Sequence, residues 1–150
     1  ILVNTKKINN VKKFAKEFIC HSSQIPFIAK GSIMQNVTMF EDNVDIKKFN
    51  QALKDSCSDE FIIKNNIDYH EIFNDLKKNF SGGELQRLQI ARTLYYDKDI
   101  MIFDESTSAL EPDLEEKIIL NLRGRLKNKI IIFISHREMN KKYFTKFLKF

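Results

Sequence analysis

Two short segments of this sequence carry side chains whose types and spacing suit phosphate chemistry. In the first, residues 81–84 (Ser-Gly-Gly-Glu) begin a stretch with helical periodicity. Backbone N–H groups at the start of a helix attract phosphate, and glycines let a ligand approach the backbone closely. In the second, the apolar run 100–103 ends in two adjacent carboxylates, Asp104 and Glu105. Together the two segments predict a site for a phosphate group and a metal ion.

Asp104 and Glu105 suit two different tasks. Asp104 follows four large apolar residues, so its carboxylate can reach a Mg²⁺ ion from the end of a strand. Mg²⁺ in proteins takes one or two carboxylates together with phosphate oxygens and water. Glu105 comes one step later and points elsewhere, which suits a group that orients or deprotonates a water attacking a γ-phosphate. The alternative is an Asp-Glu pair that only begins a loop.

Polar side chains also follow two other apolar strands. Gln24 comes shortly after one of them and could contact a metal ion or an attacking water. His136 comes directly after the other, where an imidazole can hydrogen-bond a γ-phosphate oxygen. Ligands of open parallel sheets sit beyond the carboxyl ends of the strands. We therefore expect Gln24, Asp104 and His136 to face one cleft; the alternative is that the three sheet ends are simply solvated.

The hydrophobic periodicity predicts an alternation of strands and helices. Strands are predicted at residues 17–20, 100–103 and 130–134, with one more edge strand at 144–150. Helices are predicted at residues 33–37, 45–56, 81–95 and 112–127. Residues 61–63 suit either a strand or a helix, and 69–76 a short helix. The order strand, helix, strand across 100–134 predicts a parallel sheet, and the continuous apolar run 100–103 predicts a strand covered on both faces.

Local capping residues support two of these helices and the start of a third. Ser32 can cap the short helix at 33–37. Ser81 and Glu84 have the spacing of a capping box, in which each side chain satisfies a backbone donor. Pro112 fits the first position of the helix that follows it.

Composition limits the class of protein. The 150 residues suit one domain or a large part of one, and 43% hydrophobic residues with 13 Phe are enough for a core. No apolar run is long enough to span a bilayer, and no secretory signal begins the sequence. Cys20 and Cys57 suit a reducing compartment and lack metal-binding spacing. His21 and His70, which no motif supports, are interpreted as surface residues.

The net charge of +5 permits nucleic acid, anionic lipid or nucleotide as a partner. The basic residues are scattered in pairs along the chain. This distribution favours a solvated, lysine-rich surface over a dedicated basic patch.

In this order, the motifs resemble the nucleotide-binding domain of ATP-binding-cassette (ABC) proteins, and the resemblance extends from the first residue to about Arg137. Residues 80–84 are similar to its signature motif, 100–105 to Walker B with the catalytic Glu, 106–111 to the D-loop, 135–137 to the switch-histidine segment and 23–27 to the Q-loop. Residues 31–33 with 36–37 resemble the sequel that is usual in exporters.

The resemblance implies an α/β fold with an incomplete parallel-sheet core of the P-loop NTPase type. Residues 1–32 and 96–150 would form this core, and residues 33–95 an inserted α-helical subdomain. The domain would hydrolyse ATP to drive transport, with Glu105, His136 and Gln24 as catalytic residues and Asp104 with Gln24 as Mg²⁺ ligands. The residues that would contact ATP are Ser81, Gly82, Gly83, Glu84 and Ser108.

The resemblance also implies partners and a location. A second nucleotide-binding domain would form a dimer in which the signature of one subunit contacts the γ-phosphate held by the other. The helical subdomain would touch the transmembrane domain of the transporter, and Phe27 with the segment after Gln24 would couple the two. The domain would lie at the cytoplasmic face of the cell membrane, and no nucleic acid is expected as a partner.

Three departures from the family pattern qualify these expectations. No G-x-x-x-x-G-K-[ST] loop occurs, so we expect most β- and γ-phosphate contacts to be missing and the chain, read as part of a longer domain, to be inactive alone. Glu111 stands where the D-loop usually has Asp. Residues 72–79 lack the acidic, glycine-containing stretch that usually precedes the signature in exporters.

Two other functions compete with a transporter ATPase. A head domain of a DNA-repair or chromosome-organising ATPase shares the signature and Walker B; the positive charge favours it, whereas Pro26-Phe27 and residues 31–33 speak against it. A non-catalytic interaction module is the other. The joint presence of Gln24 and residues 104–105 with His136 argues against that module.

Overall fold

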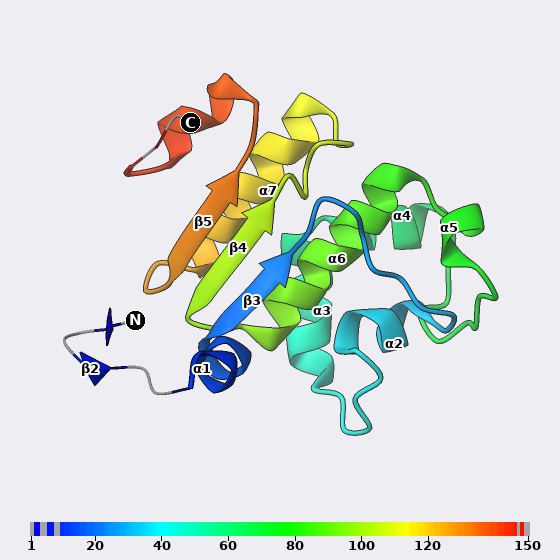
Figure 1. Cartoon of the computed structure of the whole chain (residues 1–150). Coiled ribbons are helices and arrows are strands. Elements are labelled where there is room, and N and C mark those ends of the chain that lie inside the picture. The colour runs from blue at the N-terminus through cyan, green and yellow to red at the C-terminus, as the bar shows by residue number, and fades with distance from the viewer. Residues whose placement is uncertain (1, 4–5, 8–9, 147, 149–150) are drawn as a thin grey trace.

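The computed structural model describes residues 2–3, 6–7, 10–146 and 148. The polar site residues predicted at strand ends lie at the ends of three parallel strands. β3 (Ile19–Ser22), β4 (Ile100–Asp104) and β5 (Ile130–Ile134) lie side by side in that order (Figure 1). Both strand pairs are parallel, and Asp104 lies in register with Ile134. The predicted parallel sheet is therefore confirmed, with its three carboxyl ends along one edge.

The strand predicted at 17–20 begins later than expected. Residues Val11–Phe18 form helix α1, whose first turn is capped by Asn10 through a hydrogen bond from Lys13 N to Asn10 Oδ1 of 3.0 Å. Phe14 and Phe18 stack one helical turn apart, with ring centroids separated by 4.9 Å. This local cap and aromatic pair extend the helix to the residue before β3.

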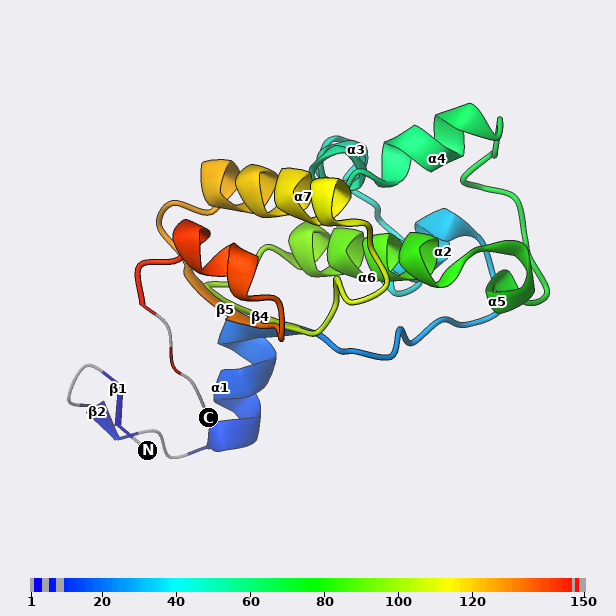
Figure 2. The same cartoon turned by 90° about the horizontal axis from the view of Figure 1, so that it is seen from above.

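Helices cover one face of this sheet. α6 (Gly82–Tyr96) and α7 (Pro112–Arg125) lie on the same side of the strands (Figure 2). Met101 and Phe103 are fully buried, whereas Ile100 and Ile102 on the same strand are only partly buried. Because successive side chains of a strand point to opposite faces, a single helical layer buries only alternate residues. The prediction that 100–103 is covered on both faces is therefore wrong for the described residues.

A second group of helices lies beside α6, away from the strands (Figure 1). Its members are α2 (Ile33–Thr38), α3 (Ile46–Asp55), α4 (Ser58–Lys64) and α5 (Leu76–Asn79). The predicted helices at 33–37 and 45–56 are confirmed, and the ambiguous residues 61–63 are helical. The helix predicted at 69–76 is wrong, because Phe73 there exchanges backbone hydrogen bonds of 3.1 Å with Gly31 instead.

The remaining elements are short. β1 (Leu2–Val3) pairs antiparallel with β2 (Lys6–Lys7), and a 3₁₀ turn, η1 (Glu138–Tyr143), follows β5. The predicted edge strand at 144–150 is not formed by residues 144–146 and 148, and the rest of it lies outside the described residues. Across the described chain, no helix combines the length and apolarity that a membrane crossing requires.

α6 is the element that joins the sheet to the second group of helices. Its buried residues Leu88, Ile90, Ala91 and Leu94 belong to one core with residues of β4, α3 and α7. Polar contacts strengthen the connection: Arg92 Nε donates to the Asn36 carbonyl at 2.7 Å. The helix also carries the Ser-Gly-Gly turn at its start, so this core fixes the turn relative to the strand ends.

Candidate functional site at the carboxyl ends of the strands

Gln24, Glu105 and His136, which lie far apart in the sequence, meet at the edge of the sheet. His136 Nε2 lies 2.6 Å from Glu105 Oε1, and Gln24 Nε2 lies 3.5 Å from Glu105 Oε2. The Glu105 side chain is 18% exposed, whereas that of His136 is 91% exposed. Glu105 is thus the partly enclosed centre of the cluster, and each of its carboxylate oxygens faces one of the other two predicted residues.

The backbone of Glu105 turns its side chain away from that of Asp104. Its φ angle is +47°, in the left-handed region that a residue with a Cβ rarely adopts. Such a conformation costs on the order of 1 kcal/mol and persists where surrounding contacts hold it. Here Glu105 N donates to the Ile134 carbonyl at 3.0 Å, and Ser108 N donates to the Glu105 carbonyl at 3.1 Å. The sheet and the following turn therefore aim the two adjacent carboxylates in different directions.

Asp104 has a neighbour that the motifs did not indicate. His21 Nε2 lies 3.8 Å from Asp104 Oδ2, and the two side chains are 49% and 42% exposed. His21 is a surface residue, as interpreted, but parallel register brings the end of β3 beside the end of β4 and places its imidazole near the Asp104 carboxylate. No hydrogen bond among the described residues joins Gln24, the other predicted metal ligand, to Asp104; Gln24 bonds to Glu105 instead.

The half-exposed carboxylate of Asp104 suits the usual coordination of Mg²⁺. One or two protein carboxylates bind this ion, and phosphate oxygens and water complete its coordination shell. A dedicated cage is not required for such an ion. Within the described residues, indeed, no group of three or more His, Cys, Asp or Glu could enclose a metal.

The Ser-Gly-Gly turn forms the predicted capping box. Ser81 N donates to Glu84 Oε2 at 2.8 Å, and Glu84 N donates to Ser81 Oγ at 3.3 Å. The two glycines differ in their surroundings. A Cβ on Gly83 would lie 3.1 Å from the Ala109 carbonyl oxygen, whereas a Cβ on Gly82 would meet nothing closer than 3.9 Å. Gly83 is therefore needed for the close approach of α6 to the loop 105–111.

Gln86, one turn further along α6, connects this helix to the strand-end cluster. Its Oε1 accepts from Ala109 N at 2.9 Å, and its Nε2 donates to Ser108 Oγ at 3.0 Å and to the Glu105 carbonyl at 3.5 Å. Ser108, predicted to contact nucleotide, is thus also a partner of Gln86. The described contacts link the turn at 81–84 to the Glu105 cluster through this loop and not directly.

Gln89 holds the segment that carries Gln24. Its Nε2 donates to the Ser23 carbonyl at 2.8 Å, and its Oε1 accepts from Phe27 N at 3.0 Å. Sequence reasoning missed both glutamines. The available signal was a polar stripe, Gln86, Gln89 and Thr93, at helical spacing inside an otherwise apolar helix; all three are buried.

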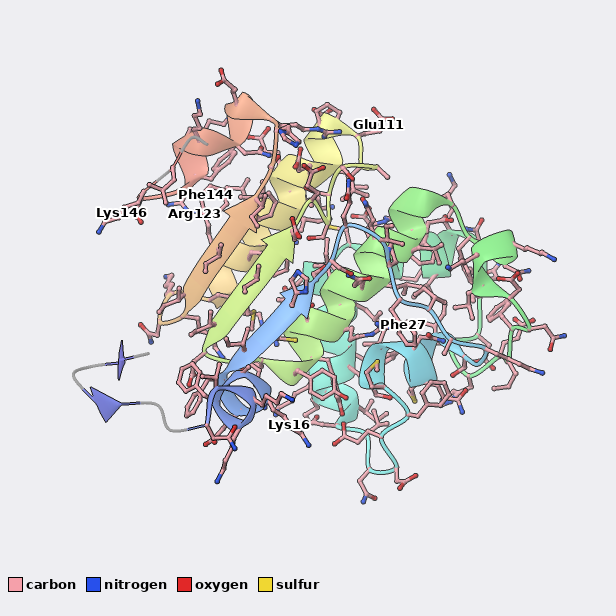
Figure 3. The ribbon with its side chains drawn as sticks, viewed as in Figure 1. Lys16, Phe27, Glu111, Arg123, Phe144 and Lys146 are labelled. Carbon is pink, nitrogen blue, oxygen red and sulfur yellow. The ribbon has the colours of Figure 1, made fainter. Side chains whose placement is uncertain are left out.

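Phe27 itself lies on the surface. Its side chain belongs to the segment that joins β3 to α2 (Figure 3) and is 62% exposed. The Arg92 guanidinium lies 5.9 Å from the Phe27 ring centroid, and burial lowers the pKa of that guanidinium from its usual value. The partly buried Arg92 cation therefore lies within cation–π distance of the exposed Phe27 ring.

Comparisons with known proteins agree on one family. A family model described as "ABC transporter" matches residues 1–108. The lactococcin-G-processing and transport ATP-binding protein LagD of Lactococcus lactis subsp. lactis is 35% identical over 89% of this chain and 19% of LagD. The pediocin PA-1 transport/processing ATP-binding protein PedD of Pediococcus acidilactici is 34% identical over 91% of this chain and 19% of PedD.

A solved structure supports the same likeness. The structure of a bacterial Atm1-family ABC exporter with ATP bound matches 91% of this chain and 24% of that chain, with a TM-score of 0.82 and 26% identity. The chain therefore spans about a fifth to a quarter of the length of these relatives.

Proposed function

Because the chain belongs to the ABC transporter family, we propose that it is part of the ATP-hydrolysing domain that drives a transporter of the exporter type. The observation that carries this proposal is the contact of Glu105 with both His136 and Gln24 at the edge of a parallel sheet. These three residue types, brought together from three strand ends, suit the activation of a water against a γ-phosphate.

Each residue has its own task in the proposed reaction. Asp104 would hold the Mg²⁺ ion, which neutralises charge on the phosphates when bound. Glu105 would orient the attacking water and accept its proton, because its carboxylate is turned away from Asp104. His136, exposed beyond Glu105, would hydrogen-bond the γ-phosphate, and Gln24 would contact the water or the metal from the opposite side of the Glu105 carboxylate.

The turn at 81–84 would serve a second nucleotide. In the proposed dimer, Ser81, Gly82 and Gly83 present the start of α6 to ATP held by the other nucleotide-binding domain, with Glu84 fixing the turn and Ser108 completing the contact. Glu111, at the start of α7 (Figure 3), would face the same partner across the dimer. The side chain of Glu111, longer than the usual Asp, would weaken that contact.

Residues 33–95 would form the helical subdomain, and residues 1–32 with 96–150 parts of the catalytic core. The exposed ring of Phe27 would couple the domain to a transmembrane domain at the cytoplasmic face of the membrane. The relatives described above are named as transport ATP-binding proteins, and these names do not favour the alternative of a DNA-repair or chromosome-organising head.

The test is ATP turnover by the protein as its gene encodes it, purified in lipid. Replacing Glu105→Gln should lower kcat by roughly 10² or more, because general base catalysis typically contributes that much. The same variant should retain bound ATP, measured by filter binding. Glu17→Gln, which changes an exposed glutamate on α1, is the matched control and should turn over normally. Unchanged turnover in the Glu105 variant would refute the proposed role.

A further inference from the structure

The most completely buried carboxylate beside the site belongs to a residue with no role so far. Glu115, in the first turn of α7, is 1% exposed. Its Oε1 accepts from Thr107 Oγ1 at 2.6 Å and from Asn140 Nδ2 at 2.9 Å, and its Oε2 accepts from Arg137 Nη1 at 2.7 Å. A buried charge is tolerated when it is paired and hydrogen-bonded in this way.

These partners come from the two segments that flank the Glu105–His136 contact. Thr107 lies two residues after Glu105, and Arg137 directly follows His136. Arg137 extends the network, because its Nη2 donates to the Ser108 carbonyl at 3.2 Å and to the Leu110 carbonyl at 2.9 Å. One buried carboxylate and one guanidinium thus tie the loop 105–111 to the segment after β5.

The His136 side chain has little else to hold it. It is 91% exposed, and its one ion pair or hydrogen bond among the described residues is the 2.6 Å contact with Glu105. Its backbone lies between the end of β5, which the sheet holds, and Arg137, which Glu115 anchors. A displacement of about 1 Å at a reacting group can cost roughly a hundredfold in rate, so this anchor bears directly on the proposed chemistry.

We propose that Glu115 is a positioning residue that keeps His136 against Glu105 by tying the loop 105–111 to Arg137. This inference rests on the proposed function, since it assigns Glu115 an effect on the same reaction. It also makes a structural claim, namely that the two segments loosen together when the carboxylate is lost, and this claim can be measured without nucleotide.

The test is a double-mutant cycle on the protein as encoded. Glu115→Gln keeps the shape of the side chain but replaces one acceptor by a donor that faces donors. It should lower kcat for ATP roughly tenfold to a hundredfold, with KM changed less than about threefold. In a His136→Ala background the same change should have almost no further effect, because residues that act through one another are not additive.

The adjacent residue supplies the control. Glu116, on the same helix, is bonded to Lys142 at 3.3 Å and to the Tyr143 hydroxyl, outside this network. Glu116→Gln should leave kcat and KM as in the unchanged protein. The proposal would be overturned if Glu115→Gln and Glu116→Gln lowered kcat equally. It would also be overturned if Glu115→Gln lowered kcat by the same factor with and without His136→Ala.

Amide hydrogen exchange without nucleotide gives the second readout. In Glu115→Gln, exchange should accelerate in residues 106–110 and 136–138 together, while α6 keeps its protection; unchanged exchange in both segments would overturn the proposal. Should this variant not fold, Arg137→Lys, which keeps the charge but loses the fork of donors, carries the same test. A protein without any ATP turnover would refute the proposed function, and the exchange result would still decide the positioning claim.

Discussion

Replacing Gln86→Ala should uncouple the start of α6 from the loop 105–111. The side chain is 4% exposed and makes two hydrogen bonds of 3.0 Å or less, from Ala109 N and to Ser108 Oγ. Each such bond contributes about 1 kcal/mol net, and an unpaired donor left behind adds to the loss. We therefore expect the free energy of unfolding to fall by about 2 to 3 kcal/mol, which corresponds to about 5 to 10 °C in Tm for a chain of this size.

Two further variants sharpen this prediction. Gln86→Glu keeps acceptors for Ala109 N and the Ser108 hydroxyl, but it places an unpaired carboxylate at a buried position facing the Glu105 carbonyl, so its loss should be at least as large. Gln51→Ala removes an exposed helical glutamine whose one hydrogen bond runs to Asp55 at 2.9 Å, and should change stability by less than about 0.5 kcal/mol.

Urea denaturation measures all three variants, and amide exchange at Ala109 reports the lost bond directly. The reasoning would be refuted if Gln86→Ala cost no more than Gln51→Ala. It would equally be refuted if the Ala109 amide kept its protection without the Gln86 side chain.

Two other predictions follow from local packing and charge. Gly83→Ala should be about 1 to 3 kcal/mol less stable than Gly82→Ala in urea denaturation, because only at position 83 would the new Cβ lie 3.1 Å from a carbonyl oxygen; equal stabilities would contradict this. Burial raises the pKa of the Cys57 thiol from 9.0 to about 11, so folding favours the neutral thiol. The contribution of this preference to the stability of the folded protein is intact below pH 9 and is lost as pH rises from 9 through 11. The stability lost between pH 8 and 10.5 should therefore be smaller in Cys57→Ala, by on the order of 2 kcal/mol, and a loss equal to that of the unchanged protein would contradict it.

Motifs with strong local causes were predictable from the sequence. The capping box at Ser81 and Glu84, the Pro112 start of α7 and the apolar runs of β4 and β5 each depend on residues close together in the chain. Their order was enough to indicate the family. In contrast, residues 69–76 carry a helix-like pattern, but a backbone bridge to Gly31 overrides it. That partner lies about 40 residues away, and no local window contains it.

The sequence by itself determined which chemical groups stand at the ends of the strands, because adjacent residues fix where an apolar run stops and a polar side chain follows. Only the tertiary structure decided how those groups face one another. The left-handed backbone of Glu105 depends on hydrogen bonds from β5 and the next turn. The meeting of His21 with Asp104 depends on strand register, and the burial of Glu115 depends on partners from two later segments. Such contacts arise when distant segments pack together, and their energy has no counterpart in the spacing of residues along the chain.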